Sequence, residues 1–196
     1  AKAYYPDTKS DLSTIFMEKC IDMCSQNGRI AMINIPVWMF LVSFENQRKV
    51  LIKDNMFSTL IHFGRGVFGA DFGTVAFVIN KHRTPNYQAT YLRLFDKSSA
   101  VDSVEQKEQW YLEKKGEAII RQESFGRISG FPIAYWISPE MLNAFDSFPL
   151  LSSVAEPRQG LITGDNDRFL REWFEIEANK LNRKWFVYNK GGNYRK

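Results

Sequence analysis

A long apolar run, RIAMINIPVWMF, occupies residues 29–40. Such a run is typical of a strand that is covered on both faces, as in a parallel sheet. Apolar residues recur every three or four positions in residues 11–26, which predicts a helix before the run. Residues 43–55 are expected to form a second helix. The chain therefore begins with helix, strand and helix, a pattern that favours an α/β fold.

Three further strands are predicted, at residues 57–63, 74–80 and 87–95, from their apolar content and the turn residues between them. The first two follow each other with only a glycine-rich turn between them, so we expect them to pair in antiparallel fashion. The order of helix, strand, helix, strand and strand predicts one α/β sheet.

Residues 96–116 differ in composition, because they are polar, charged and without a wide apolar face. We interpret them as an interdomain linker with a helical part. Beyond them, residues 118–120 and 132–137 have short β-like patterns and precede a helix that Ser138 caps and Pro139 begins. The expected domain organisation is a first domain, a linker and a second domain, at residues 1–96, 97–116 and 117–196.

The small numbers of cysteines and histidines argue against several classes of site. Cys20 and Cys24 are the only cysteines, and one helical face is expected to hold both as core residues. With His62 and His82 as the only histidines, a disulfide framework, a metal site and a Ser-His-Asp or Cys-His nucleophile are all disfavoured. No apolar stretch reaches the roughly 18–20 residues of a membrane span. We therefore expect a soluble, cytoplasmic protein without a metal.

Residues 64–69 spell Gly-Arg-Gly-Val-Phe-Gly, which matches the dinucleotide fingerprint G-x-G-x-x-G. That fingerprint requires a helix after the loop, whose N-terminus holds the pyrophosphate. Here a predicted strand follows instead, so a nicotinamide- or flavin-dependent oxidoreductase is disfavoured. Two interpretations of these residues remain: a glycine-hinged connection between two strands, or a functional loop of another kind.

The formal charge of +4 is distributed unevenly. The last 17 residues contain six basic residues and no acid, so the rest of the chain has a charge of −2. A basic end on a near-neutral body indicates a polyanionic partner. The basic residues are Lys180, Arg183, Lys184, Lys190, Arg195 and Lys196.

Three stretches resemble adenine-specific DNA methyltransferases that modify the exocyclic amino group. The first is DLSTIFMEKCIDMCSQNGRIAMINIPVWMF, and the second is the loop and strand RGVFGADFGTVAFVINK. The third joins AEPRQGLITGDNDRFLREWFEI to KWFVYNKGGNYRK and is similar to the PglX family of BREX phage-exclusion enzymes. In the first stretch the match is carried by Asp11, Leu12, Phe16, Glu18, Gly28, Pro36 and Trp38.

The resemblance implies the C-terminal half of a Rossmann-like S-adenosylmethionine-dependent methyltransferase sheet, followed by an α+β DNA-recognition segment. The full enzyme would be bacterial, would methylate adenine in double-stranded DNA and would act in restriction-modification or phage defence. Neither the glycine-rich cofactor turn nor the Asn/Asp-Pro-Pro-Tyr/Phe loop of such enzymes occurs in this chain. We therefore expect a fragment that is inactive alone, contains no catalytic residue, and lacks the N-terminal half of the same protein.

An enzyme that acts on a duplex base must extrude it, and the extruded base needs an aromatic face to stack on. The resemblance indicates Phe68 for this role, with Phe72 as the competitor. It also indicates DNA contacts by polar and basic residues of the C-terminal third, namely Arg158, Gln159, Thr163, Asn166, Arg168, Arg171, Lys184, Lys190 and Arg195. The alternative for these charges is a solvated surface.

A second function class stays open, a DNA-binding specificity module without catalysis. The presence or absence of the two methyltransferase loops upstream in the parent sequence distinguishes it from the enzyme. Removal of half a sheet would also leave the strand at residues 30–35 at an unpaired edge, which seeks a partner. We therefore expect a homodimer through this edge.

Overall fold

A computed structural model describes residues 3–69, 72–97 and 100–189. Contacts between residues divide the chain into two units, residues 1–150 and 151–196. The first unit contains a five-stranded sheet with helices, and the helical elements described in the second are all short. Within the described residues, no helix is both long and apolar enough to cross a membrane.

The sheet of the first unit is mixed. Its strands are β1 (Arg29–Asn34), β2 (Met56–Gly64), β3 (Thr74–Asn80), β4 (Gln88–Arg93) and β5 (Glu117–Arg121). They lie in the order β1-β3-β2-β4-β5, and β3 is antiparallel to both of its neighbours. β2 and β4 are parallel, whereas β5 is antiparallel to β4. The predicted α/β class and the antiparallel β2–β3 pair are confirmed.

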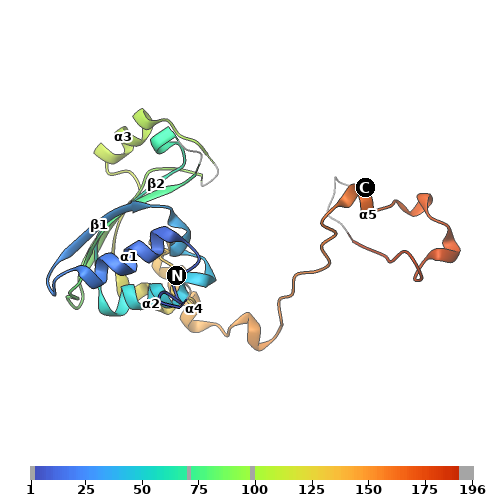
Figure 1. The fold of residues 1–196 in the computed structure, drawn as a ribbon, viewed down its shortest axis with the longest axis horizontal. Helices are drawn as coiled ribbons and strands as arrows, with labels where there is room; N and C mark the ends of the chain where they lie inside the picture. The colour runs from blue at the N-terminus through green and yellow to red at the C-terminus, as the bar shows by residue number, and fades with distance from the viewer. Residues whose placement is uncertain (1–2, 70–71, 98–99, 190–196) are drawn as a thin grey trace. The chain divides into compact units, whose positions relative to one another are not determined.

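Two helices cover one face of this sheet (Figure 1). These are α1 (Leu12–Met23) and α2 (Glu45–Asp54), and Asp11 caps α1 through a hydrogen bond that Ser13 N donates to its side chain. α3 (Val104–Leu112) lies apart from them in the same view.

The core between the sheet and these helices is aromatic. The ring of Trp38 stacks on Phe57 at 6.1 Å between centroids and meets the Phe77 ring edge-on at 5.3 Å. The indole N–H of Trp38 is also satisfied, because it donates to Asn34 Oδ1 at 2.9 Å. Trp38, which carries part of the sequence resemblance, is thus a core residue.

The prediction that the apolar run forms a strand buried on both faces is wrong. β1 ends at Asn34 and is followed by a 3₁₀ turn, η1 (Pro36–Met39), whose Trp38 and Met39 enter the core. Ala31 and Ile33 face away from α1 and are exposed, Ile33 by 55%. A shallow apolar hollow of about 280 Å³ lies on this open face, lined by Ala31, Met32, Ile33, Thr59, Ile61, Ala76, Phe77 and Val78.

The segment expected to be a linker is packed on the first unit. α3 buries Trp110 against Leu92 and Leu94, so part of the polar segment has an apolar contact that its composition does not suggest. β5 then extends the same sheet. The compact unit therefore continues through residue 150, although the functional division at 96 and 117 stays a prediction.

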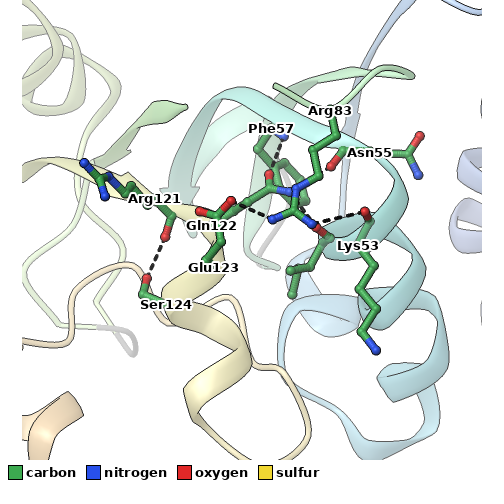
Figure 2. A network of polar contacts seen from close by, with 9 residues as sticks. Lys53, Asn55, Phe57, Arg83, Arg121, Gln122, Glu123 and Ser124 are labelled. Carbon is green, nitrogen blue, oxygen red and sulfur yellow. Dashed lines mark hydrogen bonds and ion pairs between the residues drawn. The ribbon is translucent and has the colours of Figure 1, made fainter. Parts of the chain in front are cut away.

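A buried glutamine fixes the turn after β5 to the start of β2 (Figure 2). Phe57 N donates to Gln122 Oε1 at 2.9 Å, while Gln122 Nε2 donates to the carbonyls of Ile52 and Asn55, both at 2.7 Å. At the surface, Arg83 forms an ion pair with Glu123 at 2.6 Å. The bond from Phe57 to Gln122 connects segments that are 65 residues apart in sequence.

A buried arginine makes a second connection of this kind. Arg48, on α2, is 1% exposed and donates to the carbonyls of Trp38 and Leu41 at 2.8 and 2.6 Å. It also donates twice to the carbonyl of Gly130, at 2.7 and 3.0 Å. Burial lowers the pKa of Arg48, and the nearby charge of Glu45 opposes that shift.

Residues 132–137 form turns, which corrects their predicted strand. Ala134 N donates to Pro132 O and Ile137 N to Ala134 O, and the long-range bond from Ile133 N to Met39 O is not part of a strand pairing. Ile133, Ala134 and Tyr135 are all buried, so the apolar residues that suggested a strand are core residues of an irregular segment. Ser138 caps α4 (Pro139–Ser147), as predicted.

The second unit has no buried residue among those described, 151–189. Its elements are one four-residue helix, α5 (Asn166–Phe169), and three 3₁₀ turns. Large rings remain in solvent, including Trp173 at 81% and Phe186 at 70% exposure. A segment of this size rarely buries enough apolar surface to form a core of its own.

Candidate functional site

Three strands of the sheet end at the same edge. β1 and β2 both run antiparallel to β3, and β4 is parallel to β2, so their carboxyl ends point the same way. We call this the carboxyl edge. In α/β sheets with parallel strands, ligands bind outside such an edge.

Glycines bring the segments after these strands close together. A Cβ atom on Gly73, after the β2–β3 loop, would lie 3.5 Å from Pro36 Cγ, after β1. A Cβ atom on Gly64 would lie 2.7 Å from the ring of Phe95, after β4, which is too close for any other residue. The carboxyl edge is thus a compact junction of loops from three strands.

The loop after β2 presents an aromatic ring to solvent. Phe68 lies in this loop, is 66% exposed, and has a left-handed backbone with φ of 61°. Phe72, the competing candidate, is 55% exposed. The loop leads into β3 and not into a helix, so it offers no helix N-terminus to a pyrophosphate, as the sequence predicted. Both rings are available for stacking at the carboxyl edge.

A buried histidine and tyrosine lie beside this loop. His62 Nδ1 is 3.2 Å from the hydroxyl oxygen of Tyr135, and the His62 ring meets Phe95 edge-on at 4.8 Å. Burial, together with the positive charges of Arg93 and Lys107, lowers the pKa of His62 to about 4. His62 is therefore neutral at physiological pH. Burial also raises the pKa of Tyr135.

A buried lysine joins two of the strand ends. Lys107 Nζ, on α3, donates to Phe63 O at 2.8 Å and to Leu94 O at 3.0 Å, at the ends of β2 and β4. Asp102 lies 3.8 Å away and supplies the opposite charge. Burial lowers the pKa of Lys107, and Asp102 partly opposes this shift. Lys107 fixes the position of the strand ends from which the loop with Phe68 begins.

The predicted DNA contacts lie in the second unit, where the described ones are largely exposed. Thr163 donates to Asn166 at 2.5 Å, and Asp165 caps α5, so the Gly-Asp-Asn string forms a local turn. Tyr188 donates its hydroxyl to Leu161 O at 2.9 Å. This bond brings together the two motif strings that are separated in sequence.

The guanidinium and ammonium groups in this unit have local partners. Arg158 pairs with Glu156, and Arg171 donates to the carbonyls of Asp167 and Leu170. Arg168 lies over the ring of Phe169 at 5.0 Å, and Lys184 over that of Trp185 at 5.8 Å. Lys190 and Arg195 lie outside the described residues. The roles of all these residues, and of Gln159, stay predictions.

Sequence reasoning missed several residues of the carboxyl edge. Lys107 lies in a charged segment that gave no sign of burial, and Tyr135 and Trp136 appeared only within a region rich in aromatic residues. Phe40 belonged to the apolar run and is 37% exposed. In the part of the chain that the structure describes, no group of three or more His, Cys, Asp or Glu could hold a metal. Cys20 and Cys24 are free and half-buried.

Comparison with known proteins finds relatives along the whole chain. Residues 1–68 match the family model of the Eco57I restriction-modification methylase. The chain is 36% identical, over 100% of its length, to the adenine-specific methyltransferase BrxX of Escherichia coli O9:H4 (strain HS). It is 34% identical, over 98% of its length, to the adenine-specific methyltransferase PglX of Lacticaseibacillus casei (strain Zhang). The chain is thus similar, over its whole length, to a segment of these adenine-specific methyltransferases.

The chain spans only 17% and 18% of the length of these two relatives. Among solved structures, it is similar to the M protein of the type I restriction enzyme EcoKI, with a TM-score of 0.40 and 18% identity over 50% of this chain and 23% of that one. For a type I restriction-modification methyltransferase subunit from Streptococcus thermophilus, the TM-score is 0.46 and the identity 16%, over 64% and 29% of the two chains.

Proposed function

We propose that the chain is part of a site-specific DNA methyltransferase that methylates the exocyclic amino group of adenine in double-stranded DNA, in a bacterial restriction-modification or phage-defence system. Support comes from the names of BrxX and PglX and from the match of the first 68 residues to a restriction-modification methylase. The structural observation that carries the proposal is the exposed ring of Phe68 on a loop at the carboxyl edge.

In this proposal the residues to 96 form the C-terminal half of a Rossmann-like methyltransferase sheet, and those from 117 begin an α+β target-recognition region. The antiparallel β2–β3 pair at the end of a helix, strand, helix, strand series is consistent with the first part. The turn of Thr163 and Asn166 and the basic residues after it would contact phosphates and base edges in the second. The whole protein would work in the cytoplasm.

Phe68 would bind the extruded adenine by stacking, with Phe72 as the alternative ring. Stacking on an aromatic face is worth about 1–3 kcal/mol per base and holds the base out of the duplex. The chain has no Pro-Pro loop to bind the amino group, so it would orient the base without activating it. When bound, S-adenosylmethionine supplies the methyl group. The glycine loop after β2 leads into a strand and provides no helix N-terminus for this cofactor, so we assign its binding to another part of the protein.

The rest of the protein would hold the cofactor and would cover the open sheet face at Ala31 and Ile33. In its absence, a second copy of the chain would pair with the free edge of β1, which bonds only to β3 among the described strands.

The test is to express the whole reading frame that contains this chain and to measure transfer of labelled methyl groups to adenine in DNA. The proposal expects transfer that a Phe68→Ala variant reduces. Sequence-selective DNA binding without any methyl transfer would instead support a specificity module. Calorimetry adds an independent test, since micromolar S-adenosylmethionine binding by the 196 residues alone would contradict the assignment of the cofactor to another part of the protein.

A further inference from the structure

Two exposed aromatic rings lie together at the carboxyl edge, on segments other than the loop with Phe68. Phe40 follows η1 after β1, and Trp136 lies in the turn before α4. Their ring centroids are 5.5 Å apart with a tilt of 53°, and the residues are 37% and 47% exposed. Nothing in the proposed function uses this pair.

Contacts with buried rings and one backbone hydrogen bond hold the pair in place. Trp136 meets Tyr135 edge-on at 5.0 Å, and Phe40 lies 6.5 Å from the ring of His62. The two backbone segments are bonded directly, because Ile133 N donates to Met39 O at 3.0 Å. Rings that are already held in place lose little conformational entropy when a ligand binds.

Positive charges lie near the pair, although Asp102 accompanies one of them, Lys107, at 3.8 Å. Arg93 is half-buried, and its guanidinium lies 5.8 Å from the centre of the Phe95 ring, which in turn contacts His62. Arg93 and Lys107 are the charges that act on His62, and Arg93 also acts on Tyr135. A cation beside exposed rings suits a ligand that combines a flat base with a phosphate.

We propose that Phe40, Trp136 and Arg93 form a second base-binding platform, which stacks an unstacked nucleobase of the bound DNA other than the base at Phe68. The proposal rests on the proposed function, because it requires DNA with an extruded base at the carboxyl edge. Phe40 and Trp136 supply the stacking faces, and Arg93 supplies a charge for the adjoining phosphate. Extrusion of one base leaves its former partner and its neighbours without a stacking face, so such a base is available.

The test uses the whole protein and duplex DNA that contains its methylation site. 5-Iododeoxyuridine, which crosslinks to aromatic residues on illumination, replaces one nucleotide at a time, and mass spectrometry locates the crosslink. We expect a crosslink to Trp136 or Phe40 from a position other than the methylated adenine. Trp136→Ala should weaken DNA binding about 5- to 150-fold, as expected for the loss of one stacked base, whereas Trp136→Phe should retain most of it.

Tyr87→Ala is the matched control, because Tyr87 is 37% exposed but lies before β4, at the opposite end of that strand from the carboxyl edge. It should leave binding unchanged. The proposal of a second platform would be overturned if the Trp136→Ala variant binds DNA with unchanged affinity and neither ring forms a crosslink, even if methyl transfer is normal. Loss of a protein partner by Trp136→Ala without loss of DNA affinity would overturn it in favour of a protein-docking surface. Absence of methyl transfer by the parent protein would instead count against the proposed function.

Discussion

His62 Nδ1 lies 3.2 Å from the hydroxyl oxygen of Tyr135, although 73 residues separate the two in sequence. His62 is on β2, and Tyr135 is in the turn before α4, beyond the segment expected to be a linker. Both side chains are buried, His62 with 7% exposure and Tyr135 with 1%. The contact therefore connects the sheet to residues of the predicted second domain at the carboxyl edge.

The low pKa of His62 predicts acid sensitivity of the fold. The pKa is about 4 in the folded chain, because of burial and then the charges of Arg93 and Lys107, against 6.5 for an ordinary histidine. The unfolded chain therefore takes up a proton first as the pH falls below 6.5, which favours unfolding. We expect the free energy of unfolding to decrease between pH 6.5 and pH 4 by up to about 3 kcal/mol, measured by urea denaturation.

His62→Phe should remove most of this pH dependence, whatever it does to stability at neutral pH. His82→Gln is the control, because His82 is exposed and its replacement should leave the dependence intact. An equal slope in the His62→Phe variant and the wild-type chain would show that His62 is not responsible.

Replacement of Arg48 should strongly destabilise the first unit. Arg48→Leu leaves the carbonyls of Trp38, Leu41 and Gly130 without their donor inside the fold, which costs on the order of 3 kcal/mol or more in the free energy of unfolding. Lys49→Met is the neighbouring control, since the half-exposed pair of Lys49 with Glu45 is at the surface, where such pairs contribute little to stability. Thermal or urea denaturation measures both, and equal effects would argue against this role of Arg48.

Phe68 should matter for base capture more than Phe72. In the parent protein, Phe68→Ala should reduce the fluorescence increase of 2-aminopurine placed at the target adenine and lower kcat/KM about 5- to 150-fold. Phe68→Trp should preserve both, because it retains a stacking face. A larger defect in Phe72→Ala than in Phe68→Ala would reverse the assignment.

The basic end should make DNA binding sensitive to salt. Removal of residues 180–196 should weaken binding and reduce the slope of log affinity against log salt, by about 0.9 for each phosphate that the protein no longer neutralises. The paired substitutions Arg183→Gln and Lys184→Gln test the described part alone, with the exposed Lys19→Gln on α1 as the control. Gel-shift titrations at several salt concentrations give the slopes, and identical slopes would identify these charges as a solvated surface.

The isolated chain should self-associate through the outer edge of β1. Ile33 is a residue of β1 and is 55% exposed. The substitution Ile33→Lys places a charge on this edge strand, which disfavours its pairing with another strand. Val42→Lys is the control, since Val42 is 82% exposed and outside any strand. Sedimentation should show a concentration-dependent dimer that only Ile33→Lys abolishes; a monomer at high concentration would contradict the prediction.

Local sequence signals predicted most elements of the first unit. The strand at 74–80 was predicted with the bounds that β3 has, and the cap at Ser138 with Pro139 at the start of α4 was also correct. These features depend on residues within a few positions of one another. The burial of β1 was mispredicted, because an apolar run does not reveal whether a second layer covers the strand.

Long-range contacts explain what the sequence did not reveal. Trp110 and Lys107 lie in a charged segment, and only the strand ends of β2 and β4 give them partners. Gln122 is likewise a core residue because its side chain forms hydrogen bonds with three backbone groups that are far away in sequence. Phe68 was identified only through resemblance to a family, since nothing in its local sequence separates a stacking ring from a packing ring.

The backbone of Phe68 has an unfavourable conformation. A left-handed φ of 61° is unfavourable for a side chain with a Cβ atom by about 1 kcal/mol, whereas glycine adopts it freely. Glycine occupies the nearby left-handed positions 66 and 69. Phe68 therefore holds its ring in a backbone conformation that glycine would adopt without this cost.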